Sequence, residues 1–162
     1  MSRPLPVPLA GSDAPSGKDV LGFLRLLWAI DHGLQTHSKR MSRAFGVTGP
    51  QRLVLRILGR HGHLTSGQLA ALLHLHASTL TGIVRRLQLQ GFVTRQVDPR
   101  DRRRYHLALT DRGRAVNSMR VGTVEAELEA ALGDLTPGQL AAAEYALESI
   151  GLRLSENRQR RR

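Results

Sequence analysis

The chain has 162 residues and a formal net charge of +11, with 24 lysine and arginine residues against 13 acidic ones. This length suits one domain of ordinary size, and 41% hydrophobic residues are enough to form a core. A positive surplus of this size favours binding to nucleic acid or to an anionic surface. The chain has no cysteine, which excludes disulfides, thiolate metal ligands and oxidant sensing through a thiol.

The start of the chain is rich in proline, glycine and serine and lacks the continuous apolar segment of a signal peptide. It predicts a flexible arm over 1–17, followed by a single domain over 18–157 and a basic tail over 158–162. No run approaches the roughly 18 consecutive apolar residues that suggest a membrane span. We therefore expect a cytoplasmic protein with no membrane partner.

Two helices are predicted first. In 18–46, apolar residues recur every seven positions at Leu27, Leu34 and Met41, and Gly46 is expected to end that helix. A second helix is expected from Pro50 to about residue 60, because proline is favoured in the first turn of a helix.

The next two predicted helices differ in character. Thr65 and Gln68 have the spacing of a capping box, which predicts a helix start, and another helix is expected over 76–90 before Gly91. This second helix has one apolar stripe and one small, polar and basic face without an acid. Hydroxyls and arginines bond base edges and phosphates, so we expect this face to contact DNA. The stripe is Leu80, Ile83, Val84 and Leu87; the polar face includes Ser78, Thr79, Thr81, Gly82, Arg85 and Arg86.

Two β-rich segments, 92–97 and 105–109, predict a hairpin, and Asp98-Pro99 suits a turn. Its tip carries charges that repel one another in a free hairpin, and a phosphate backbone or a narrow minor groove would neutralise them. A helix pair followed by a basic hairpin is a winged helix-turn-helix, predicted over 48–110. The charged tip residues are Arg100, Asp101, Arg102, Arg103 and Arg104.

The remainder of the chain predicts two more helices. Thr110 is expected to begin one that runs to about residue 132, and Thr136 begins a last one with leucines every seven positions. Apolar seams in 18–46 and 111–157 favour an intertwined homodimer, with an intramolecular bundle as the alternative. The predicted fold class is mainly α (α+β): a winged helix-turn-helix with N- and C-terminal dimerisation helices.

Three segments, LTSGQLA, ASTLTGIVRRLQLQGFV and DPRDRRRYHLALTDRG, resemble the MarR family of bacterial transcriptional regulators. The specific part is Asp-x-Arg followed by a strand and Leu-Thr-x-x-Gly; the resemblance extends loosely over 18–157. It implies a homodimer on pseudo-palindromic double-stranded DNA, often a repressor released by a small molecule. It also implies that Arg103 enters the minor groove and that Asp101 orients it.

The expected function is therefore a sequence-specific DNA-binding regulator, not an enzyme. The sequence has no Gly-x-Ser-x-Gly elbow, no phosphate-binding glycine loop and no His-Glu-x-x-His, and we expect no cofactor. The predicted DNA-binding residues are Ser78, Thr79, Thr81, Arg85, Arg86, Arg100, Asp101, Arg102 and Arg103.

The resemblance also implies an effector pocket between the dimer helices and the DNA-binding part. A small aromatic or phenolic acid would place its ring near Trp28 and its carboxylate near Arg52 or Arg56. Trp28 resembles a tryptophan of urate-responsive members, but those members have an aspartate where this chain has Leu53, which argues against urate. The predicted pocket residues are Trp28, Asp31, His32, Arg52 and Arg56.

Two alternatives use the same scaffold. The first is a metal-responsive regulator that binds through histidines, the commonest metal ligands. No cysteine and no nearby carboxylate completes such a ligand set, so no metal site is predicted. The second is an architectural DNA-binding protein without a ligand. Metal-dependent DNA affinity would identify the first, and indifference to DNA sequence the second. The histidines concerned are His61, His63, His74 and His76.

Overall fold

The computed structural model describes residues 19–98, 101 and 105–159, and side chains as far as Leu154. Within these residues the chain forms seven helices and a two-stranded antiparallel sheet, which confirms the mainly α winged-helix class. None of the described helices is long and apolar enough to cross a membrane. The elements are α1 (Val20–Phe45), α2 (Gly49–His61), α3 (Ser66–Leu72), α4 (Ala77–Leu89), β1 (Val93–Val97), β2 (Tyr105–Leu109), α5 (Asp111–Ser118), α6 (Val124–Gly133) and α7 (Pro137–Gln159).

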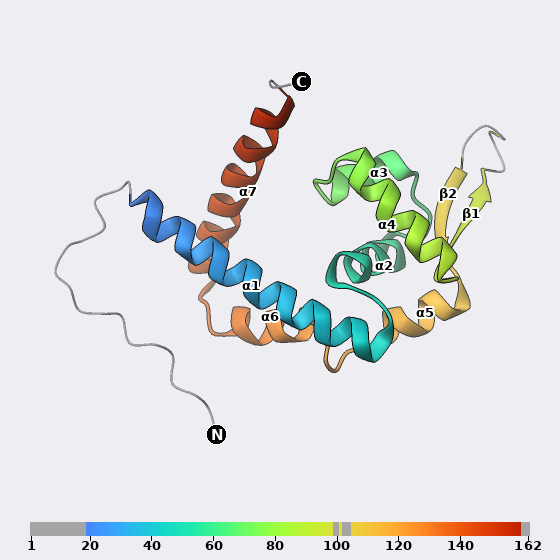
Figure 1. Ribbon diagram of the computed structural model, residues 1–162, viewed down its shortest axis with the longest axis horizontal. Coiled ribbons are helices and arrows are strands. Elements are labelled where there is room, and N and C mark those ends of the chain that lie inside the picture. The colour runs from blue at the N-terminus through green and yellow to red at the C-terminus, as the bar shows by residue number, and fades with distance from the viewer. Residues whose placement is uncertain (1–18, 99–100, 102–104, 160–162) are drawn as a thin grey trace.

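One part of the molecule, which we call the head, consists of α2, α3, α4, the hairpin and α5 (Figure 1). The hydrophobic core lies almost entirely in the head, around Leu55, Leu58, Leu69, Leu80 and Leu87. Helix α1 packs against α2 and α6 through its C-terminal half, where Met41 is its one buried residue. The long helices α1 and α7 extend away from the head.

The hairpin is fastened to the start of α3. Val93 pairs with Leu109 and Val97 with Tyr105, so the two strands are in simple register. Leu64, just before α3, forms an additional bridge with Leu107: its N–H donates to the Leu107 carbonyl at 3.3 Å and its carbonyl accepts at 2.7 Å. This bridge was not predicted, and it fixes the hairpin relative to the helix pair.

Several predicted helix ends are confirmed. Gln68 and Thr65 form the expected capping box at α3, where the Gln68 Oε1 accepts from the Thr65 N–H at 2.9 Å. Gly46 and Gly91 follow α1 and α4 with φ of +74° and +72°, the left-handed region that glycine tolerates. Helix α7 continues through Gln159, so the first residues of the predicted tail are helical.

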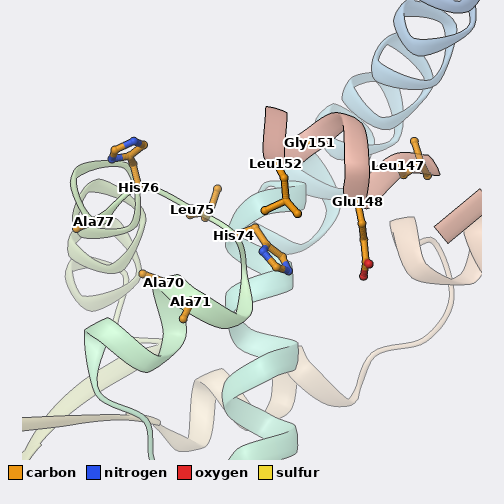
Figure 2. Close-up of a pocket in the computed structure, with 10 residues that line it drawn as sticks. All are labelled: Ala70, Ala71, His74, Leu75, His76, Ala77, Leu147, Glu148, Gly151 and Leu152. Carbon is orange, nitrogen blue, oxygen red and sulfur yellow. The ribbon is translucent and has the colours of Figure 1, made fainter. Parts of the chain in front are cut away.

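An open groove of about 810 Å³ separates α7 from the connection between α3 and α4 (Figure 2). Leu152 and Glu148 of α7 point across it towards His74, which has a positive φ of 49°. Apart from His76, the remaining lining is apolar or small, and α7 approaches the head without forming a continuous core with it.

The prediction of one helix from Thr110 to about residue 132 is wrong. The chain leaves the helix after Ser118 and re-enters at Val124. Gly122 has a φ of +73°, and the Thr123 Oγ1 accepts a hydrogen bond from the Ala126 N–H at 3.3 Å, which caps α6. A left-handed glycine followed by a capping threonine was the sequence signal for this break.

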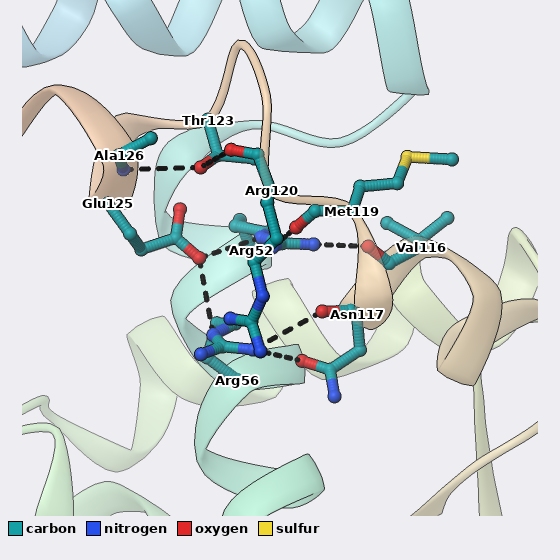
Figure 3. A network of polar contacts seen from close by, with 9 residues as sticks. All are labelled: Arg52, Arg56, Val116, Asn117, Met119, Arg120, Thr123, Glu125 and Ala126. Atoms are coloured by element: carbon teal, nitrogen blue, oxygen red, sulfur yellow. Dashed lines mark hydrogen bonds and ion pairs between the residues drawn. The ribbon is translucent and has the colours of Figure 1, made fainter.

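Arg52 of α2 holds this break together from inside the protein (Figure 3). Its side chain is 2% exposed, and its guanidinium donates to the carbonyls of Val116 and Met119, the latter at 2.6 Å. Its Nε donates to the Glu125 Oε1 at 2.8 Å. Arginine therefore adds a second donor to the Val116 carbonyl, which also accepts from the Met119 N–H, binds the Met119 carbonyl, and neutralises a carboxylate at the start of α6.

Replacing Arg52 with leucine should lower the free energy of unfolding by about 3–5 kcal/mol, because a largely buried ion pair loses one partner and the carbonyls of Val116 and Met119 lose the guanidinium as a donor. Arg56 is a matched control. It also contacts Glu125, at 3.4 Å, but its side chain is 31% exposed. Arg56→Leu should cost less than about 1 kcal/mol. Urea unfolding followed by circular dichroism measures both values; equal losses would contradict the role assigned to Arg52.

Candidate nucleic-acid interface

Helix α4 presents two chemically different faces. Leu80, Val84 and Leu87 are buried in the head. The opposite side is exposed and contains no acidic residue, since α4 has none in its sequence. A short, exposed helix face with hydroxyls and arginines can enter the major groove and contact base edges and phosphates. The exposed residues are Ala77, Ser78, Thr79, Thr81, Gly82, Arg85, Arg86 and Leu89.

The arginines of this face are available for a partner. Within the described residues, neither Arg85 nor Arg86 makes a hydrogen bond or an ion pair. Thr81 differs, because its Oγ1 donates to the Ala77 carbonyl at 2.7 Å and keeps only its acceptor capacity for a ligand. Gly82 leaves open space beside the helix, so a partner can approach the backbone closely.

The C-terminal end of α4 is held by a chain of amides that the sequence did not reveal. The Gln51 Nε2 donates to the Gln90 Oε1 at 3.2 Å, and the Gln90 Nε2 donates to the Gly46 carbonyl at 3.0 Å. Gln51 is 6% exposed. These contacts join the end of the candidate recognition helix to the junction between α1 and α2, and they fix the direction in which α4 projects.

At the base of the hairpin tip, the His106 Nε2 lies 2.7 Å from the Asp98 Oδ2. This contact links the residue after β1 to the second residue of β2. The sequence alone did not reveal this contact, because the partners lie eight positions apart and meet only when the register of the two strands is known. Asp101 is half-buried and also has an interaction. The other predicted tip residues, Arg100, Arg102 and Arg103, lie outside the described residues.

Thr110 and Gly113 of the Leu-Thr-x-x-Gly motif have structural contacts. The Thr110 Oγ1 donates to the Gly91 carbonyl at 2.6 Å and accepts from the Gly113 N–H at 3.1 Å. A Cβ atom at Gly113 would overlap the carbonyl oxygen of Phe92. Together they join the ends of α4, β2 and the start of α5 at one point.

The residues of the predicted effector pocket fall into two groups. Trp28, Asp31 and His32 are exposed on α1, with Trp28 67% exposed. Arg52 and Arg56 lie on α2 around Glu125, and protein acceptors already occupy both guanidinium groups. No hydrogen bond or ion pair between described residues joins the two groups. A single chain therefore does not bring all five side chains together.

The four histidines of the metal alternative are all exposed and lie on or beside α2 to α4. In the part of the chain that the structure describes, no three histidine, cysteine, aspartate or glutamate side chains are arranged to hold a metal ion. The groove lined by His74 and His76 also contains Glu148, but their spacing does not form such a group.

Comparisons with known proteins point to one family. Residues 45–104, which span α2 to the hairpin tip, match the model of the MarR family. The organic hydroperoxide resistance transcriptional regulator of Bacillus subtilis is 32% identical over 88 residues, or 54% of this chain and 60% of that protein. The transcriptional regulator TtmR of Methylorubrum extorquens is 37% identical over 90 residues, or 56% of this chain and 46% of that protein.

The chain thus spans about half of the length of these curated relatives, which are transcriptional regulators and not enzymes. Among solved structures, a mutant of MarR from E. coli in complex with operator DNA has a TM-score of 0.65 and 25% identity. That match covers 82% of this chain and 95% of the E. coli chain. Over residues 45–104, the chain is similar to the MarR family.

Proposed function

We propose that the protein is a homodimeric, sequence-specific DNA-binding transcriptional repressor that acts on a pseudo-palindromic operator. The observation that carries the proposal is the exposed, acid-free face of α4, whose two arginines have no partner among the described residues, beside a hairpin whose tip is basic in sequence. The family match on the same residues and the operator complex of a similar structure support it. Helix α4 would occupy the major groove, and Arg103 at the tip would enter the adjacent minor groove.

Exposed apolar side chains support the dimer. In the single chain, Leu21 and Trp28 of α1 are 78% and 67% exposed, and Tyr145 and Leu154 of α7 are 75% and 66% exposed. Monomeric proteins rarely leave apolar surface of this extent in water. A second copy that covers α1 and α7 would bury it. Two heads related by a two-fold axis would then read half-sites about 10 base pairs apart, or a small multiple of that distance.

A small aromatic or phenolic acid is proposed as the releasing ligand. Trp28 offers an exposed indole on the surface that the dimer would enclose, and Arg56 offers a half-exposed guanidinium on the neighbouring helix α2. Arg52 is buried, so it would act on the pocket indirectly, through its ion pair with Glu125. Completion of the pocket would need the second copy, because one chain leaves Trp28 uncovered.

Binding to DNA should prefer an inverted repeat over a scrambled duplex and weaken steeply with salt, because neutralised phosphates release counterions. Operators selected from random duplexes supply the inverted repeat, and fluorescence anisotropy measures affinity from low to moderate salt. Equal affinity for scrambled duplexes would favour the architectural alternative, and affinity that appears only with zinc would favour the histidine alternative.

Variants in the same assay refine this prediction. Arg86→Ala should weaken operator and scrambled duplexes by the same factor and reduce the salt slope by about 1 per subunit, or about 2 for the dimer, as expected for a phosphate contact. Ser78→Ala at the start of α4 should lower the preference for the operator. Arg120→Ala is a charge-matched control, because Arg120 is exposed in the connection between α5 and α6.

Ligand release can be tested with Trp28, the only tryptophan of the chain. A phenolic or benzoic acid that binds beside it should change its fluorescence and lower operator affinity through a coupling free energy of about 1–3 kcal/mol. By linkage, operator DNA should weaken binding of the acid by the same factor. If a broad panel of such acids changes neither signal, ligand release by this class is wrong, while the DNA-binding proposal stands.

A further inference from the structure

A second groove, of about 450 Å³, lies between the start of α3 and the hairpin. The bridge between Leu64 and Leu107 joins its two walls, so its shape does not depend on the hairpin tip. Leu107 is 1% exposed and forms the floor. Its lining residues are Thr65, Ser66, Arg95, Tyr105 and Leu107, none of which is acidic.

Strand register places the two largest of these side chains together. Arg95 pairs with Leu107 and Val97 pairs with Tyr105, so Tyr105 is the diagonal neighbour of Arg95 on the same face of the hairpin. Arg95 is exposed, and Tyr105 is 52% exposed. The guanidinium and the phenol therefore stand at one rim, and the Ser66 hydroxyl stands at the other.

These polar groups have no partner within the described residues. Neither Arg95, Tyr105 nor Ser66 makes a side-chain hydrogen bond or ion pair there. Each can donate: arginine through its planar fork, and serine and tyrosine through a hydroxyl. Several donors that include a cation, without a nearby acid, match the non-bridging oxygens of a phosphate.

The place of the groove in the fold identifies the source of that phosphate. In a helix-turn-helix, the first helix crosses the DNA backbone while the second lies in the major groove. Here α3 is the first helix, and the groove lies between it and the hairpin whose tip would enter the next minor groove. One phosphate backbone separates a major groove from the neighbouring minor groove, so that backbone must pass between the two elements.

We propose that Arg95, Tyr105 and Ser66 bind a backbone phosphate between the major-groove and minor-groove contacts. The inference rests on the proposed DNA-binding function and adds three residues to it. Such a contact carries no sequence information, but it fixes the distance and angle between α4 and the hairpin on the duplex. Arg95 supplies the charge, and the two hydroxyls supply neutral hydrogen bonds.

Charge and hydrogen bonding can be separated by salt titration of the full-length protein on its selected operator. Arg95→Ala removes one phosphate contact from each of the two subunits, so it should reduce the slope of log K against log salt by about 1.8. Its affinity loss between 50 and 200 mM salt should then be about 12-fold smaller than that of the unchanged protein. Arg95→Lys should keep the slope. Tyr105→Phe and Ser66→Ala should weaken binding at every salt concentration and leave the slope unchanged.

Arg120→Ala, with the same loss of charge outside the groove, should keep the original slope, and thermal unfolding verifies that each variant is folded. If Arg95→Ala is folded and its salt slope is unchanged, the phosphate site is wrong. The proposed DNA binding still stands in that case, provided that the affinity of the unchanged protein depends steeply on salt. If Arg95→Ala changes the ratio of operator affinity to scrambled-duplex affinity, Arg95 contacts a base, and the phosphate site is wrong in that case too. Failure of the unchanged protein to bind any duplex would remove the proposed function and this inference together.

Discussion

The buried guanidinium of Arg52 joins α2 of the head to α6 across the end of α5. It reaches from α2 to the last carbonyls of α5 and to Glu125 at the start of α6. Because Arg52 is 2% exposed, its charge is stabilised almost wholly by protein groups. The position of α6 relative to the head follows from this one side chain.

The same helix α2 also directs α4. Leu55 and Leu58 of α2 lie in the core with Leu80 and Leu87 of α4, and Gln51 reaches Gln90 at the end of α4. One face of α2 thus supports the candidate recognition helix, while Arg52 supports the helices proposed to form the dimer. In a two-fold dimer, any rotation of α2 would change the distance between the two recognition helices. In such a dimer, a ligand or a substitution that moves α2 would change the half-site spacing that the two recognition helices can bind.

Local patterns predicted most of the head, because caps and apolar stripes depend on neighbouring residues. Thr65 with Gln68, the glycines at 46 and 91, and the stripe of α4 all have the predicted role. Arg52 escaped prediction because its partners lie 64 to 73 residues away, and in sequence it resembles a surface arginine on an amphipathic helix. The break between α5 and α6 was missed although Gly122 and Thr123 mark it locally; the contacts of Arg52 that hold it could not be read from neighbouring residues. The contact between His106 and Asp98 needed the strand register.

Geometry explains the Leu-Thr-x-x-Gly motif, which belongs to the most specific pattern in the sequence. Thr110 binds the Gly91 carbonyl and the Gly113 N–H, and Gly113 lies so close to Phe92 that any side chain would collide with its carbonyl. The end of α4, the hairpin and α5 therefore meet at one compact joint. We propose that α4 and the hairpin enter different grooves of one duplex. A joint that fixes their mutual angle before binding would avoid the entropy cost of ordering them on the DNA. In the proposed complex, the threonine and glycine of the motif would act through this rigidity.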